Sequence, residues 1–292
     1  MALQHALARA VNQGSIEDAQ SLIARKADVS ALFECESYLR MATKRGDLPM
    51  VRLLLQHHAP LRAPDRKYNA AAIACKRGYR EILELLLEQP RSSIDCRGTT
   101  PLVLAFEYQR YELVDLLLRH GCSIHAKSDS GLSPLHVAAA RSLTAVRMCL
   151  DLGAQVDDPD MMGSEPLQFA AFAGRADCVR ELLEACASVN NASSSGRTAL
   201  HQAAKKGSAE CVALLLHYGA DKSALHGENT AADVACSDEI RRIIEIHGTD
   251  ALLRRHSRSH LELELMRLSQ VGAGVPVGWQ EHRRSFASRL RC

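Results

Sequence analysis

The 292-residue sequence has few aromatic side chains, only 4% of its residues, although apolar residues make up 47%. A core with so few rings must be built from closely packed Ala, Leu, Val and Ile, a composition typical of helices. An excess of charge of either sign is also lacking, because 36 Lys and Arg face 34 Asp and Glu, which leaves a net charge of +2. This balance disfavours a chain that binds nucleic acid or a membrane surface through its overall charge.

Several targeting and cysteine signals are missing as well. No apolar run reaches the roughly 18 residues of a membrane span, and no basic start precedes an apolar stretch, so we expect neither a span nor a secretory signal. This predicts a location in the cytoplasm, the nucleus or both. The ten cysteines form no CxxC pair, which excludes the usual zinc-ligand and redox motifs. We expect reduced thiols that act as small apolar core residues.

Motifs for catalysis are absent too. The sequence has no GxxxxGKS phosphate loop, no GxSxG elbow and no HExxH helix. The one adjacent histidine pair, His57 and His58, would point in different directions on a helix and is a poor metal site. The sequence therefore predicts a protein that is not an enzyme, with no catalytic residues, no bound metal and no cofactor.

The sequence instead contains an internal repeat. Four similar segments, Thr-Pro-Leu, Ser-Pro-Leu-His, Glu-Pro-Leu and Thr-Ala-Leu-His, begin at Thr100, Ser133, Glu165 and Thr198, at spacings of 33, 32 and 33 residues. Each has Ala at its sixth place and is followed by a second apolar stretch that ends near Gly-Ala or a variant of it. Weaker copies begin at His5, Ser37, Asn69 and Thr230, which gives eight units over about residues 1 to 247. A period of this length is typical of a stacked repeat protein.

The physical properties of the unit agree with two short helices and a turn. Proline is tolerated at the first helical position because that position needs no N–H donor, and a preceding Thr or Ser can accept a bond from the helix start. Small alanines at the sixth and seventh places let neighbouring first helices approach closely, while rows of leucine fill the space around the second helices. Each unit alone buries too little surface, so stability must come from contacts between neighbours.

Residues 198 to 221 carry the clearest resemblance to a known family. Thr198, Leu200 and His201 are followed by Ala203-Ala204, a Gly turn, a Val-x-Leu-Leu-Leu stretch and Gly-Ala-Asp, a pattern that resembles the ankyrin repeat. The resemblance implies an all-α solenoid of stacked repeats over residues 1–248, each a helix-turn-helix with a β-hairpin loop, and a tail over 249–292 that is helical or partly disordered. It also implies that His136 and His201 bridge turn and helix backbone. Gln109 in place of the turn Gly, and Ser142 in a fifth unit that is one residue short, predict local irregularity.

The resemblance further implies a non-catalytic protein-interaction scaffold that binds a partner on its concave face, through hairpin tips and exposed positions of the first helices. The residues at such places are Lys44, Arg45, Arg66, Lys67, Tyr68, Lys76 and Arg77 in the second and third units, Arg97, Tyr108, Leu132, Met161, Met162 and Phe172 in the middle, and Arg197, Lys205 and Lys206 in the seventh unit. An apolar centre between basic flanks predicts a partner protein with an apolar anchor flanked by acidic or phosphorylated residues. The alternative is that Phe172 packs back on the stack and the basic residues are only a solvated face. Nucleic acid is disfavoured because an apolar zone splits the positive groups.

The tail offers a second hypothesis. Residues 251–268 have helical spacing of leucine and are expected to cap the last repeat, and Trp279, Phe286 and Leu290 are spaced for another helix that could dock. With eight Arg and four acids, this tail could fold back, bind a partner groove, touch anionic lipid or stay disordered. The chain could then be a substrate-receptor or targeting subunit of a larger complex, for example of a ubiquitin ligase. The box that recruits such a ligase opens with a Leu-x-x-x-Cys helix, but here Leu261 is followed by Leu265, and no Cys occurs between residues 237 and 291, which weakens this hypothesis.

Overall fold

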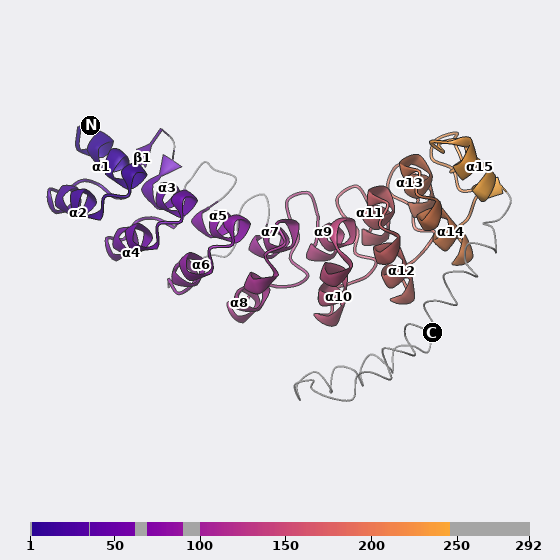
Figure 1. The fold of residues 1–292 in the computed structure, drawn as a ribbon, viewed down its shortest axis with the longest axis horizontal. Helices are drawn as coiled ribbons and strands as arrows, with labels where there is room; N and C mark the ends of the chain where they lie inside the picture. The colour runs from indigo at the N-terminus through magenta and orange to yellow at the C-terminus, as the bar shows by residue number, and fades with distance from the viewer. Residues whose placement is uncertain (1, 35, 62–68, 90–99, 246–292) are drawn as a thin grey trace, which may run out of the picture. The chain divides into compact units, whose positions relative to one another are not determined.

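The computed structural model describes residues 2–34, 36–61, 69–89 and 100–245 of the chain (Figure 1). These residues belong to two compact units, unit 1 with residues 1–134 and unit 2 with residues 135–292. Unit 1 contains α1 (Ala2–Gln13), α2 (Ile16–Ala24), β1 (Leu32–Phe33), β2 (Glu36–Ser37), α3 (Tyr38–Arg45), α4 (Leu48–Gln56), α5 (Ala70–Arg77), α6 (Arg80–Leu87), α7 (Pro101–Glu107), a 3-10 turn (Tyr111–Leu113) and α8 (Val114–Arg119). Unit 1 ends at Pro134, which is also the first residue of the next helix, α9.

Unit 2 continues with the same alternation of helices. It contains α9 (Pro134–Arg141), α10 (Leu143–Asp151), α11 (Pro166–Ala173), α12 (Ala176–Glu184), α13 (Ala199–Lys206), α14 (Ala209–His217) and α15 (Asp238–Glu245). The described parts of both units are thus predominantly helical, which confirms the predicted all-α solenoid of helix pairs.

Within each unit the helices form two layers. In unit 1 the first helices of the repeats, α1, α3, α5 and α7, pack on one another in chain order, and the second helices α2, α4 and α6 pack in a parallel row. In unit 2, α11 packs on α13, while α10, α12 and α14 form the second layer. We call these two layers the first-helix side and the second-helix side.

Helix starts and stops follow the local chemistry of the repeat. The side chains of Ser37, Asn69 and Thr100 each accept a hydrogen bond from the backbone N–H three residues on. Such a bond satisfies one of the free donors at a helix start. The turn between the two helices requires a left-handed residue, and Gly46 takes it with φ +78°. Gln109 adopts the same conformation in the fourth unit with φ +57°, so the missing glycine is accommodated without loss of the helix pair.

Three of the described loops between repeats contain short antiparallel pairs, as predicted. β1 and β2 pair antiparallel, with Phe33 opposite Glu36. In unit 2 single bridges join Ala192 to Thr198 and His226 to Asn229. These ladders are only one or two residues long, so they order the hairpin tips without building a sheet.

Two units depart from the regular pattern. In the shortened fifth unit Ser142 is extended, with φ −157°, and α10 begins directly after it. In the eighth repeat the prediction of two helices is wrong, because residues 231–234 form turns and only α15 is helical. The Asp233 carboxylate accepts bonds from the backbone N–H and the hydroxyl of Thr230, which closes a local turn where the helix was expected.

The alanine at the sixth place of each repeat lies between the first helices. Ala42, Ala74, Ala105, Ala138, Ala170 and Ala203 are all fully buried. Cys75, Cys149, Cys178 and Cys211 are buried in the same cores, and burial raises the pKa of Cys178 to about 12 and that of Cys211 to about 11. These thiols are unreactive core groups. Cys186 and Cys236 are exposed, so the expectation of core cysteines is wrong for these two.

Leu215 of α14 provides a test of the stack. Its side chain is fully buried, so Leu215→Ala should lower the free energy of unfolding by about 2 to 5 kcal/mol by leaving a cavity. The neighbouring Leu216 is only half-buried, and Leu216→Ala is the matched control with a clearly smaller loss. Urea denaturation followed by circular dichroism measures both; equal losses would contradict the packing assigned to α14.

Candidate functional site

The predicted basic residues of unit 1 end its first helices. Lys44 and Arg45 are in the last turn of α3, and both are exposed. Lys44 Nζ is 2.6 Å from Glu36 Oε1, and the Arg45 guanidinium donates to the carbonyl oxygens of Asn12 and Gln13 at the end of α1. Arg45 thus completes the backbone hydrogen bonding of the preceding first helix.

The next pair along the chain differs in its partners. Lys76 lies over the ring of the half-buried Tyr108, with Nζ 4.8 Å from the ring centre. Arg77 is exposed and has no hydrogen bond or ion pair to any described residue. Leu132 is half-buried in the loop that precedes α9. Arg66, Lys67, Tyr68 and Arg97, as well as the tail residues Trp279, Phe286 and Leu290, lie outside the described residues.

Unit 2 presents an aromatic ring to solvent. Phe172 of α11 is 58% exposed, so its side chain does not pack back on the stack. Lys205 and Lys206 are in the last turn of the adjacent helix α13. The Lys206 side chain packs against Gly174, the residue after α11. A Cβ added to Gly174 would lie 3.3 Å from Cγ of Lys206. Neither lysine forms an ion pair with a described residue. We call Phe172, Lys205 and Lys206 the α11–α13 patch.

A second exposed apolar group lies on a hairpin tip of unit 2. Met161 and Met162 are 74% and 64% exposed. The tip is held from below, because the Asp160 carboxylate accepts from the backbone N–H of Met162 and of Ser164. The carbonyl of Met162 accepts from the N–H of Ser194 on the next tip. The methionines are therefore displayed on an ordered support.

Arg197 takes part in a contact between neighbouring hairpins. Its Nη2 is 2.9 Å from His226 Nε2, and His226 Nδ1 is 2.7 Å from the carbonyl of Ser195. If Nδ1 donates to that carbonyl, Nε2 can accept from the guanidinium. Arg197 is half-buried as well, so it is less available to a partner than Lys205 or Lys206.

The histidines at the fourth place of the repeat connect neighbouring repeats within unit 2. His136 is fully buried with Nε2 3.0 Å from the carbonyl of Ser164. His201 Nε2 is 3.3 Å from the carbonyl of Asn229, and its Nδ1 is 2.9 Å from the Thr198 hydroxyl. The implied bridging role of both side chains is confirmed.

The sixth repeat contains an equivalent bridge that the histidine motif did not predict. Gln168 stands at the fourth place, where two other units have histidine, and its Nε2 donates to the carbonyl of Asn191. The Asn191 amide in turn donates to Glu165 Oε1 at 2.7 Å. Burial raises the pKa of Glu165, the residue in place of the usual Thr or Ser. The shared repeat position was the signal that could have identified this pair of substitutions.

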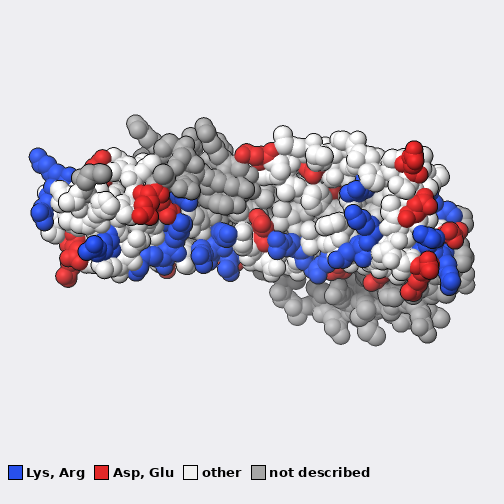
Figure 2. All heavy atoms as spheres, turned by 90° about the horizontal axis from the view of Figure 1, so that it is seen from above, with Lys and Arg blue, Asp and Glu red and all other residues white. Residues whose placement is uncertain are grey.

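One further exposed residue was also missed. Leu225 is 57% exposed on the hairpin tip after that of Ser195, and its carbonyl lies against Gly196. Figure 2 looks onto the first-helix side and shows Lys and Arg side chains gathered beside a broad uncharged area in unit 2. An apolar group with nearby cations can bury a hydrophobic side chain and attract an anionic one.

Other classes of site receive no support from the described residues. In residues 2–34, 36–61, 69–89 and 100–245, no three His, Cys, Asp or Glu side chains are grouped to hold a metal ion. Over the same ranges, no helix combines the length and the apolar content that a membrane crossing requires.

Known proteins share the repeat pattern. The family model for ankyrin repeats (3 copies) matches residues 7–96, 39–128, 89–160 and 135–226. Among curated proteins, the Drosophila melanogaster transient receptor potential cation channel subfamily A member 1 is 29% identical over 145 residues, which are 47% of this chain and 12% of the channel. The mouse B-cell lymphoma 3 protein homolog is 37% identical over 29% of this chain and 21% of its own length. The human ankyrin repeat and SOCS box protein 11 is 36% identical over 34% of this chain and 31% of its own. The chain thus spans less than a third of each of these relatives.

His201 makes the stability of unit 2 depend on pH. Burial, opposed by the bond to Asn229 and reinforced by His226 and Arg197, lowers the pKa of His201 from 6.5. The unfolded chain then binds more protons than the folded chain once the pH falls through 6.5, so the free energy of unfolding decreases with acidification. Gln168 bridges two repeats from the equivalent position, so His201→Gln keeps a side chain capable of this bridge but removes the titrating group. The substitution should therefore lessen this decrease. Urea denaturation at about pH 7.5 and about pH 5.5 compares the two proteins; the same pH dependence in both would contradict the assignment.

Proposed function

Because the chain belongs to the ankyrin-repeat family, whose repeats bind other proteins, we propose that it is a non-catalytic scaffold that holds a partner protein on the first-helix side of unit 2. The observation that carries this proposal is the exposure of Phe172 beside two lysines without ion-pair partners among the described residues. A large ring with more than half of its surface exposed contributes little to packing within the stack, and such rings commonly anchor partners.

The α11–α13 patch also indicates the chemistry of the partner. Phe172 offers an apolar contact, and the ammonium groups of Lys205 and Lys206 favour carboxylate or phosphate groups. The partner is therefore a protein segment with an apolar anchor next to acidic or phosphorylated residues. Met161 and Met162 extend the apolar contact, since their flexible side chains adapt to differently shaped partners.

Apart from the exposed Arg77, the other described cations of the predicted surface already have partners within the chain, which supports the choice of unit 2. Lys44, Arg45, Lys76 and Arg197 each contact a carboxylate, a carbonyl, an aromatic ring or a histidine of the chain itself. A cation that already has a partner contributes less to binding, because that partner must first be given up or shared. Lys205 and Lys206 have no ion-pair partner among the described residues, so they can bind a ligand without giving one up.

A second candidate function is that of a targeting subunit in which the repeats select a client and residues 249–292 dock a larger complex. The relative that bears a SOCS box in its name is the observation that favours it. Affinity purification with the full chain and with a chain ending at residue 248 distinguishes the two functions. Loss of a ligase complex together with retention of the other partners on truncation would favour the targeting function.

The apolar anchor can be tested once such a purification has identified a partner. Phe172→Ala combined with Met162→Ala should weaken partner binding by about 1 kcal/mol or more while stability changes little, because both side chains are exposed. Tyr218→Ala, an exposed aromatic at the end of α14 on the second-helix side, is the matched control. Isothermal titration calorimetry and thermal unfolding give the two quantities. Unchanged affinity for every verified partner would refute the anchor.

The lysines should act on the rate of association. Lys205→Glu with Lys206→Glu should slow association and reduce its dependence on salt, because exposed charges act through long-range attraction. Arg119→Glu with Arg242→Glu, at two cations that are also exposed, changes the net charge by the same amount and is the control. Surface plasmon resonance at several salt concentrations measures the rates. Equal effects of the two reversals would mean that only the total charge matters.

A further inference from the structure

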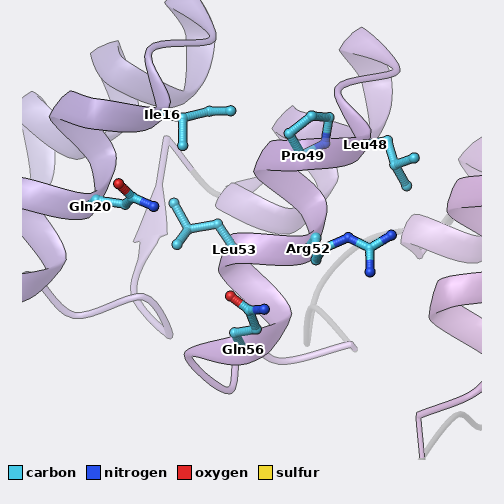
Figure 3. Close-up of a pocket in the computed structure, with 7 residues that line it drawn as sticks. All are labelled: Ile16, Gln20, Leu48, Pro49, Arg52, Leu53 and Gln56. Carbon is cyan, nitrogen blue, oxygen red and sulfur yellow. The ribbon is translucent and has the colours of Figure 1, made fainter.

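A hollow lies on the second-helix side of unit 1, between α2 and α4. It has a volume of about 410 Å³ and is lined by Ile16, Gln20, Leu48, Pro49, Arg52, Leu53 and Gln56. Figure 3 shows Ile16 and Gln20 of α2 and Leu53 of α4 pointing toward one another across the gap. Leu53 is buried and forms an apolar floor, while the two glutamines and Arg52 are exposed around it. This site shares no residue with the α11–α13 patch, which belongs to unit 2.

The arginine at this hollow lacks the ion pair that the equivalent arginines of later repeats form with a described residue. Arg52, Arg147 and Arg180 are each the fifth residue of a second helix and each follow a valine. The Arg147 guanidinium is 2.8 Å from Glu181 on the next second helix, and that of Arg180 is 4.0 Å from Glu210. Arg52 has no ion pair or hydrogen bond to any described residue.

The sequence around Arg52 accounts for the missing partner. α6 carries Leu85 at the place where α12 carries Glu181, so the carboxylate that pairs with Arg147 has no equivalent beside Arg52. Glu81 is the second residue of α6, as Glu210 is of α14, yet it is not within ion-pair distance of Arg52. A guanidinium without its usual carboxylate is a ready site for a carboxylate from elsewhere.

The shape of the hollow indicates what kind of ligand can use it. A pocket for a small molecule normally encloses most of the ligand surface. Here only Leu53 is buried among the lining residues, and the rim is open to solvent. A side chain from a protein segment needs to be covered on one face only, because its own chain covers the rest. The rim amides of Gln20 and Gln56 can pair with the backbone of such a segment.

We propose that the α2–α4 hollow is a second protein-binding site, which takes a peptide segment carrying an aliphatic or aromatic side chain next to an Asp or Glu. The apolar side chain lies between Ile16, Pro49 and Leu53. The acidic side chain reaches over the start of α4 to Arg52, which extends from the side of α4 away from α2 (Figure 3). This proposal does not depend on the proposed function of unit 2.

A random peptide library tests the proposal with the full chain as bait. Peptides that bind the natural chain are selected, and those that also bind the double variant Ile16→Asp, Arg52→Glu are then discarded by counter-selection. Ile16 begins α2, where an acidic residue is compatible with the helix, so the variant should fold, and circular dichroism verifies this. The selected peptides should be enriched in an apolar residue close to an Asp or Glu. No enrichment, or enrichment without the acid, would overturn the proposal.

Single changes then separate the two contacts by fluorescence anisotropy with one selected peptide. Arg52→Gln should weaken its binding about fivefold, and changing the peptide's acid to its amide should add little further loss on that variant. Arg147→Gln, which alters the paired counterpart in unit 2, is the matched control and should leave the affinity unchanged. Equal losses from Arg52→Gln and Arg147→Gln would refute the role of Arg52. Phe172→Ala with Met162→Ala should not affect this peptide, so failure of one site is distinguishable from failure of the other.

Discussion

Close approach of neighbouring first helices is the constraint on which the rest of this structure depends. A single helix pair buries too little surface to remain folded, and the fully buried alanine at the sixth place of the second to seventh repeats lets the next pair come near enough to share a core. Larger side chains then fill the second layer, as Leu54, Leu83 and Leu117 do in unit 1. The polar bridges of His136, Gln168 and His201 are possible only because this packing brings the loop of the next repeat within hydrogen-bond reach.

The same constraint decides which polar groups remain for partners. Stacking places the end of one first helix beside the next repeat, and several cations complete the hydrogen bonding of that end. Arg45 does so for α1, and Arg175 does so for α9 through the carbonyl of Arg141. Cations that lack such a partner among the described residues, such as Lys205 and Arg52, are therefore more informative about binding than the total number of basic residues.

Each repeat position has a tolerance set by its physical role. Glycine is common at the left-handed turn, yet Gln109, Lys26, His58 and Cys186 adopt positive φ at turns of this chain because the surrounding helices fix the backbone. In the eighth unit the bonds between Asp233 and Thr230 replace the first helix by turns. A degenerate repeat is thus tolerated where the helix pair before it supplies the packing.

The sequence alone determined the period, the paired helices and the hairpins, because alanine, proline and leucine recur at positions whose roles are local and repeated. It also predicted which residues lie at exposed places, and for Phe172, Met161 and Met162 the structure agrees. It could not decide which cations are already engaged, since the partners of Arg45, Lys76 and Arg197 come from residues about 30 positions away in neighbouring repeats. Nor could it reveal the hollow at Arg52, which exists only when α2 and α4 are placed side by side. Such contacts depend on side-chain direction and reach across an interface, and only the tertiary structure supplies these.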